Sequence, residues 1–165
     1  MPFLASITHV VGTWAHLYSE SKAVSSGVTF VHLGGVLLGG GFAVATDRMT
    51  LRAAPSDPAR RSEHLEHLHT IHRPVLIGLA LTFITGVLMF AADIEVYLPA
   101  PLFWAKMAVI AGLLVNGAVL RRTEIGLRHG DGLAGRGWKR LRRSAWLSAF
   151  LWFGALFLGT ALLTI

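Results

Sequence analysis

The chain of 165 residues contains no cysteine, and charged residues make up only 15% of it. The absence of cysteine excludes disulfides, thiolate metal ligands and cysteine nucleophiles. A typical soluble domain carries roughly 25% charged residues. Because charged residues are so few and hydrophobic residues make up 53% of the chain, the composition excludes an ordinary soluble domain. Acidic residues are especially scarce, with nine against 15 Lys and Arg, which leaves a net charge of +6.

Long apolar runs are what the sequence has in abundance. A membrane-spanning helix needs about 20 mostly apolar residues, and open strands would leave backbone groups unpaired in lipid. We therefore predict an all-α fold, a single integral membrane four-helix bundle with spans at 24–46, 74–92, 102–120 and 145–165. An apolar stripe over residues 3–18 predicts an additional amphipathic helix on the membrane surface.

The basic residues are concentrated in alternate loops. Residues 47–73 hold five Lys or Arg and residues 121–144 hold eight, so 13 of the 15 lie in these two loops. Positively charged loops stay in the cytoplasm, which predicts a bacterial cytoplasmic membrane protein with both termini outside. The same distribution predicts contact with anionic membrane lipids rather than nucleic acid.

Two ionisable residues lie well inside the predicted spans, His32 and Lys106, and both fall in the outer half of the bundle. Such residues are costly in lipid and are functional hypotheses by default. For His32 two interpretations are open: a haem ligand, or an imidazole hydrogen-bonded within small-residue helix packing. Lys106 either takes part in a site or extends its ammonium to the outer headgroups.

A haem iron bound by His32 needs a second axial ligand at similar depth. Met89 and Met107 are possible thioether ligands, and His9 or His16 would reach the site if the surface helix folds over the bundle. Ordinary core packing is the alternative for both methionines. The same four residues also offer a copper site near the outer face, because thioethers suit Cu(I).

Histidines are also concentrated before the second span, at His64, His67, His69 and His72. On one continuous helix they spread over about 200° and do not converge on a single face. A juxtamembrane helix with interfacial histidines is therefore the favoured interpretation, and a second metal or haem site the alternative. Pro74 predicts that a helix starts or breaks there.

Three segments carry a resemblance: VTFVHLGGVLLGGGF (28–42), GLALTFITGVLMF (78–90) and PLFWAKMAVIAGLLVNGAVLRR (101–122). They resemble a loose group of small bacterial four-helix membrane proteins. This group includes the HemJ-type protoporphyrinogen oxidases and the copper-resistance-D domain, and the chain looks most similar to its uncharacterised members. In the HemJ type, a first-helix histidine and a lysine that follows a tryptophan are associated with haem b binding and porphyrinogen oxidation. The resemblance implies these roles for His32 and Lys106, with Trp104 preceding the lysine.

The leading hypothesis is a haem b site in the outer half of the bundle, centred on His32, for electron transfer or tetrapyrrole redox chemistry. Lys106 would pair with a propionate, because an ammonium removed from water gains most from a nearby carboxylate. The alternative is a cofactor-free structural or accessory subunit that packs into a larger membrane complex or a homo-oligomer. Whether the chain is an enzyme stays open.

Overall fold

The computed structural model describes residues 2–52, 58–128 and 134–162, with the side chains of 11–52, 71–128 and 135–162. Within these residues the chain is helical, with no strand. The elements are α1 (Pro2–Glu20), α2 (Lys22–Arg52), α3 (Pro58–Ala92), α4 (Ile94–Tyr97), α5 (Pro101–Arg128) and α6 (Ala134–Ala161). An all-α architecture is therefore confirmed.

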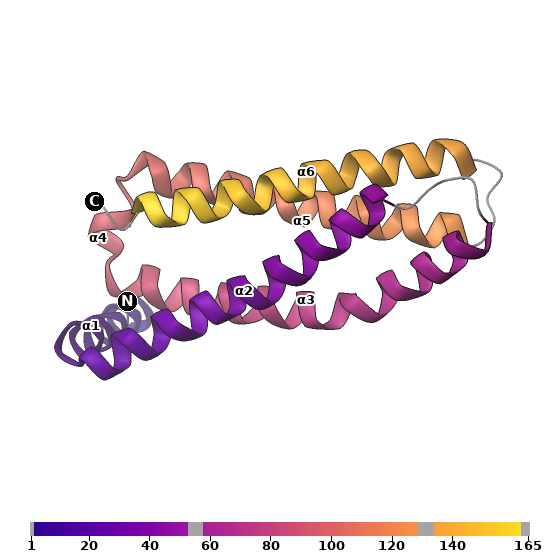
Figure 1. Cartoon of the computed structure of the whole chain (residues 1–165). Coiled ribbons are helices and arrows are strands. Elements are labelled where there is room, and N and C mark those ends of the chain that lie inside the picture. The colour runs from indigo at the N-terminus through magenta and orange to yellow at the C-terminus, as the bar shows by residue number, and fades with distance from the viewer. Residues whose placement is uncertain (1, 53–57, 129–133, 163–165) are drawn as a thin grey trace.

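The long helices form two antiparallel pairs, α2 with α3 and α5 with α6, and the pairs meet mainly where α2 contacts α6. Both chain termini lie at one end of the bundle, which we call the terminal end (left in Figure 1). At the opposite end, the basic end, α2 and α5 finish and α3 and α6 begin. The helix α1 packs on α3 and α2 at the terminal end.

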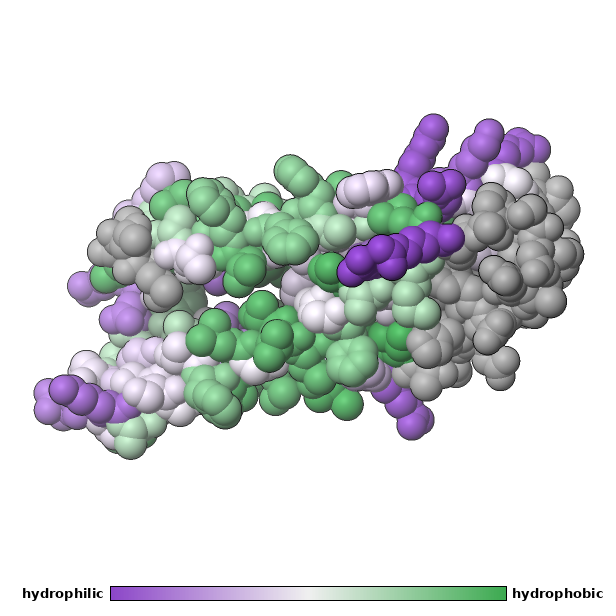
Figure 2. All heavy atoms as spheres, viewed as in Figure 1, coloured by the Kyte–Doolittle hydropathy of each residue, from purple (hydrophilic) through white to green (hydrophobic). Residues whose placement is uncertain are grey.

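Large apolar side chains lie on the surface of the bundle, and several polar side chains are buried inside it. Phe30 and Leu37 are each 77% exposed and Phe150 is 75% exposed. The buried polar residues, in contrast, are Thr46, Asp47, Thr50, Thr85, Asn116, Glu124, Ser144 and Ser148. Figure 2 shows an apolar band around the middle of the molecule, with hydrophilic side chains at both ends. Because four helices are also long and apolar enough to cross a membrane, the protein is an integral membrane helical bundle.

Glycines bring α2 and α3 into backbone contact. A Cβ at Gly35 would lie 2.9 Å from the carbonyl oxygen of Gly78, and a Cβ at Gly39 would lie 3.3 Å from the Leu79 nitrogen. Small residues at such positions let membrane helices approach closely. On another face of α2, Gly40 lies against the Trp152 ring of α6. These contacts set the depth and rotation of α2, and therefore the position of His32.

The helices continue farther toward the basic end than the sequence predicted. The helix α2 runs to Arg52, and α5 runs to Arg128. The prediction that a helix starts or breaks at Pro74 was wrong, because α3 continues through this residue. Proline removes only one backbone hydrogen bond. Just before it, His72 is tied to Glu124 of α5 by a 2.8 Å contact that holds the helix in place.

Candidate functional site

The imidazole of His32 is held against α3 by a defined hydrogen bond. Its Nδ1 lies 3.0 Å from the hydroxyl oxygen of Thr85. That hydroxyl already donates its single hydrogen within α3, 2.6 Å from the carbonyl oxygen of Leu81. The hydroxyl can therefore only accept from the ring, so Nδ1 carries the hydrogen. The lone pair of the neutral imidazole is then on Nε2.

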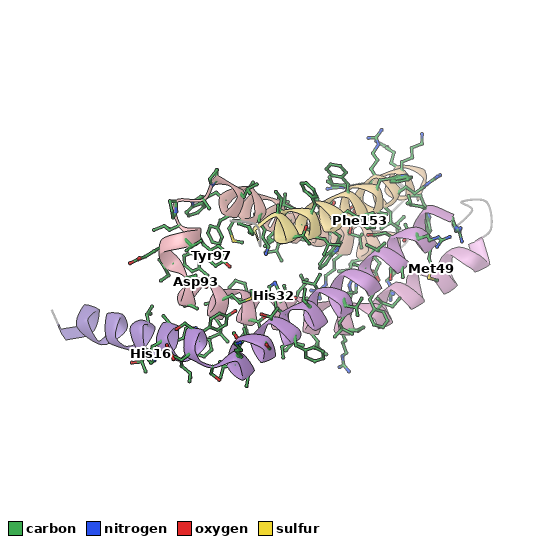
Figure 3. All side chains as sticks on the ribbon, turned by 60° about the vertical axis from the view of Figure 1, so that its left-hand side comes forward. His16, His32, Met49, Asp93, Tyr97 and Phe153 are labelled. Carbon is green, nitrogen blue, oxygen red and sulfur yellow. The ribbon has the colours of Figure 1, made fainter. Side chains whose placement is uncertain are left out.

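The other side of the His32 ring is open. The hydrogen bond to Thr85 engages Nδ1, and Nε2 takes no part in it. Gly86 lies beside the ring, and a Cβ there would come within 3.4 Å of Cε1. Figure 3 shows His32 on the side of α2 that borders the space between the two helix pairs. The imidazole of a histidine inside a membrane helix therefore borders this space.

Lys106 of α5 borders the same space from the other helix pair. Its charge is close enough to act on His32. Its Nζ lies 3.5 Å from where a Cβ on Gly159 of α6 would stand, so the side chain runs along α6 where no side chain obstructs it. Among the described residues no carboxylate pairs with this ammonium. The site thus combines an imidazole lone pair with an unneutralised cation, and so suits a ligand that carries an anionic group.

The space beside His32 results from how the two helix pairs separate. Toward the basic end they are joined, because Gly40 of α2 packs on Trp152 of α6. Toward the terminal end α3 and α5 contact each other only sparsely. Figure 2 shows the surface hollowed between the pairs on this side. His32 and Lys106 therefore lie where the two helix pairs are packed together least tightly.

The structure brings only some of the predicted site residues together. Met89 is part-buried on α3, one helical turn beyond Thr85, and Met107 is part-buried beside Lys106. His16 is exposed on α1, away from the space between the helix pairs (Figure 3). His9 lies outside the side chains that the structure describes, as do His64, His67 and His69. The roles of Met89, His16 and His9 in holding a cofactor stay predictions.

A border of aromatic residues surrounds the terminal end of the site. The indole nitrogen of Trp14 in α1 donates a hydrogen bond to the Leu88 carbonyl oxygen of α3 at 2.8 Å. Phe90 and Phe103 stack with their centroids 5.0 Å apart. Tyr97 of α4, outside the spans, is partly buried; burial chiefly, and then the charges of Asp93 and Tyr18, raise the pKa of its phenol. These contacts anchor α1 and α4 at the mouth of the space.

One buried charge network was not anticipated from the sequence. The Glu124 carboxylate is 2% exposed. It contacts His72 Nε2 at 2.8 Å and Arg128 at 3.0 Å, and so links α3 to α5. The four-residue spacing of Glu124 and Arg128 on one helix is the only local signal for it. This network lies at the basic end and connects the two helix pairs there, whereas His32 lies toward the terminal end.

The ligand set narrows what His32 can bind. Among the described residues, no three His, Cys, Asp or Glu side chains are arranged to hold a metal ion together. A lone histidine is sufficient only for a metal that brings its own equatorial ligands, as haem iron does. No family model, curated protein or solved structure matches the chain. The resemblance to the HemJ-type group therefore stays a prediction, and a functional proposal depends on the geometry of this site.

Proposed function

We propose that this multi-pass membrane protein binds haem b, or a closely related metallotetrapyrrole, between its helix pairs in the half toward the terminal end. The observation that carries the proposal is the hydrogen-bond chain from His32 through Thr85 to Leu81. A neutral imidazole that donates from Nδ1 in this chain of contacts would have Nε2 available to bind iron. Metal-binding histidines use their other ring nitrogen in this way, since donation from Nδ1 orients the ring and increases the basicity of Nε2.

Lys106 supplies the second part of the site. Haem carries propionate groups, and a carboxylate beside a poorly solvated ammonium forms a strong charge-assisted hydrogen bond. Without such an anion, a part-buried lysine in a membrane helix is unfavourable. The residues present therefore fit the group in two ways, as an axial imidazole and as a counter-charge. The resemblance noted above implies a role for the same two residues.

When bound, the haem would supply one-electron redox chemistry, for electron transfer or for oxidation of a tetrapyrrole. The residues of the chain orient and tune it. Thr85 holds the imidazole plane, and Gly86 leaves space beside the ring. Lys106 would neutralise negative charge on the ligand. Met89 is one of the candidate second ligands, with Met107, His9 and His16 as the others.

The test is a reduced-minus-oxidised absorption spectrum of the protein purified in detergent from cells grown with sufficient haem. We expect the bands of a b-type haem in the wild type, their loss in His32→Ala, and their retention in His16→Ala, since His16 is exposed. A colourless wild type that also fails to bind added haemin would refute the proposal. It would favour the alternative of a cofactor-free structural or accessory subunit, for which native mass spectrometry would show a defined partner or oligomer.

We further propose that the membrane is the bacterial cytoplasmic membrane and that the basic end faces the cytoplasm. Thirteen of the 15 Lys and Arg residues lie in the loops and helix ends at that side. The chain has no cysteine, so single substitutions at Ser19 and Arg122 create clean reporters. An impermeant maleimide added to intact cells should label S19C and leave R122C unlabelled. The reverse labelling would contradict this orientation.

A further inference from the structure

The beginning of α6 carries a hollow that is lined by four cations, Arg136, Lys139, Arg140 and Arg143. We call it the basic hollow. The spacing of these residues places them on one face of the helix. The same segment buries Trp138 (4% exposed) and Leu141 (0% exposed) against α5. This packing fixes the rotation of α6 and holds the basic face outward.

Nothing on α6 offsets this charge. The helix contains no acidic residue along Ala134–Ala161. Within the described part of the chain, no carboxylate forms an ion pair with any of the four cations. Four like charges on one helical face repel each other, so their arrangement is stabilised when an anion occupies the hollow.

The position of the hollow indicates which anion it accepts. The apolar surface of α6 begins directly beyond it, with Trp146 66% exposed and Phe150 75% exposed. Exposed tryptophan is typical of the level where headgroups meet hydrocarbon. Figure 2 shows hydrophilic side chains over the start of α6, next to the apolar band. An anion in the hollow therefore lies at the depth of the lipid headgroups, next to the exposed apolar side chains of α6.

We propose that the basic hollow binds the headgroup of an anionic phospholipid. The four cations hold its phosphodiester groups, and its acyl chains lie along the apolar face that follows. The hollow has a volume of about 420 Å³, far more than the ~30 Å³ of a water molecule, and so accepts a polyatomic headgroup. Basic pockets at the cytoplasmic ends of membrane helices hold such headgroups. The inference does not depend on the haem proposal.

The test is native mass spectrometry of the detergent-solubilised full chain, titrated with cardiolipin and separately with phosphatidylcholine. We expect one cardiolipin to be retained per chain, with phosphatidylcholine retained far more weakly. Each Lys or Arg near a lipid surface contributes about a fivefold gain in affinity. The double variant Arg140→Gln/Arg143→Gln should therefore bind cardiolipin about 25-fold more weakly. The single variant Lys139→Gln gives an independent readout, with an expected loss of about fivefold.

The matched control is Arg121→Gln/Arg122→Gln, which removes the same charge from exposed residues of α5 outside the hollow. Because these two residues do not line the hollow and the detergent-solubilised chain lies on no lipid surface, we expect less than a threefold change in cardiolipin binding. Equal losses in both double variants would overturn the proposal, because they would indicate diffuse attraction and not a site. In a final experiment, inorganic phosphate at millimolar concentration competes with cardiolipin. Displacement of cardiolipin by it would identify a soluble-anion site instead and would also overturn the proposal.

Discussion

Gly78 lies where α2 and α3 are closest, and adding one methyl group there should separate the two helices. A Cβ at this position would lie 2.6 Å from the Gly39 Cα and 2.7 Å from the Gly35 carbonyl oxygen. These atoms are backbone, so they cannot move aside as a flexible side chain can. Gly34, in contrast, has nothing within 4 Å of the same position. The substitutions Gly78→Ala and Gly34→Ala therefore form a matched pair.

The two variants should change stability in opposite directions. Overpacking a tight contact costs about 1–3 kcal/mol, and we place Gly78→Ala at the upper end because only helix separation relieves the clash. Replacing glycine by alanine in a helix also gains ~1 kcal/mol in propensity. The net expectation is a loss of about 2 kcal/mol for Gly78→Ala and a gain of ~1 kcal/mol for Gly34→Ala.

The free energy of unfolding can be measured by SDS titration in mixed micelles, followed by tryptophan fluorescence and circular dichroism. Gly78→Ala should also weaken haem retention, since separating α3 from α2 moves Thr85 away from His32. Gly34→Ala should leave the spectrum unchanged. If the two variants have the same stability within about 0.5 kcal/mol, the close α2–α3 contact is refuted as the feature that positions His32.

Three further outcomes are expected. Thr85→Val removes the acceptor of the His32 Nδ1 hydrogen and should lower haem affinity about 10- to 100-fold, measured by haemin titration; unchanged affinity would contradict the assigned tautomer. Arg128→Gln removes a charged partner of the buried Glu124 carboxylate, whereas Glu124→Gln removes the buried charge itself. In an SDS titration, Arg128→Gln should therefore be the less stable of the two variants. The reverse order would refute this account of the network. Burial raises the pKa of Tyr97, so the stability this phenol contributes is complete below its ordinary pKa near 10 and is lost as pH rises through its raised value. The absorbance difference at about 295 nm between the wild type and Tyr97→Phe can be followed as the pH is raised. Its midpoint should lie above pH ~10, and a midpoint below that would count against burial of the ring.

The four spans could be predicted from the sequence because each depends on a local property, a run of apolar residues long enough to cross a bilayer. Their ends toward the basic side could not. The segment around Pro74 carries a helix-breaking residue, yet α3 continues through it because His72 is tied to Glu124 on another helix. Local propensity does not contain such a contact.

The candidate site shows the same division. His32 and Lys106 were predicted because ionisable residues are conspicuous in apolar runs. Thr85 carried no such signal, since a threonine in a membrane helix is common. Its role appears only when the 3.0 Å contact with His32 is seen beside the 2.6 Å contact with the Leu81 carbonyl oxygen. His16, which falls on the face of α1 opposite the predicted apolar stripe, is exposed.

Four helices long and apolar enough to cross a membrane could be read from the amino-acid sequence, since hydrophobic length and charge scarcity are properties of each segment alone. The apolar runs also made His32 and Lys106 stand out as ionisable residues within the spans. The packing of the helices adds that Nδ1 of His32 contacts Thr85, that Lys106 borders the same space, and that His72 and Glu124 link the helix pairs at the basic end. These features depend on contacts between residues more than 50 positions apart, such as His32 with Thr85 and His72 with Glu124. Such pairings follow from how whole helices pack and are not encoded in any one segment.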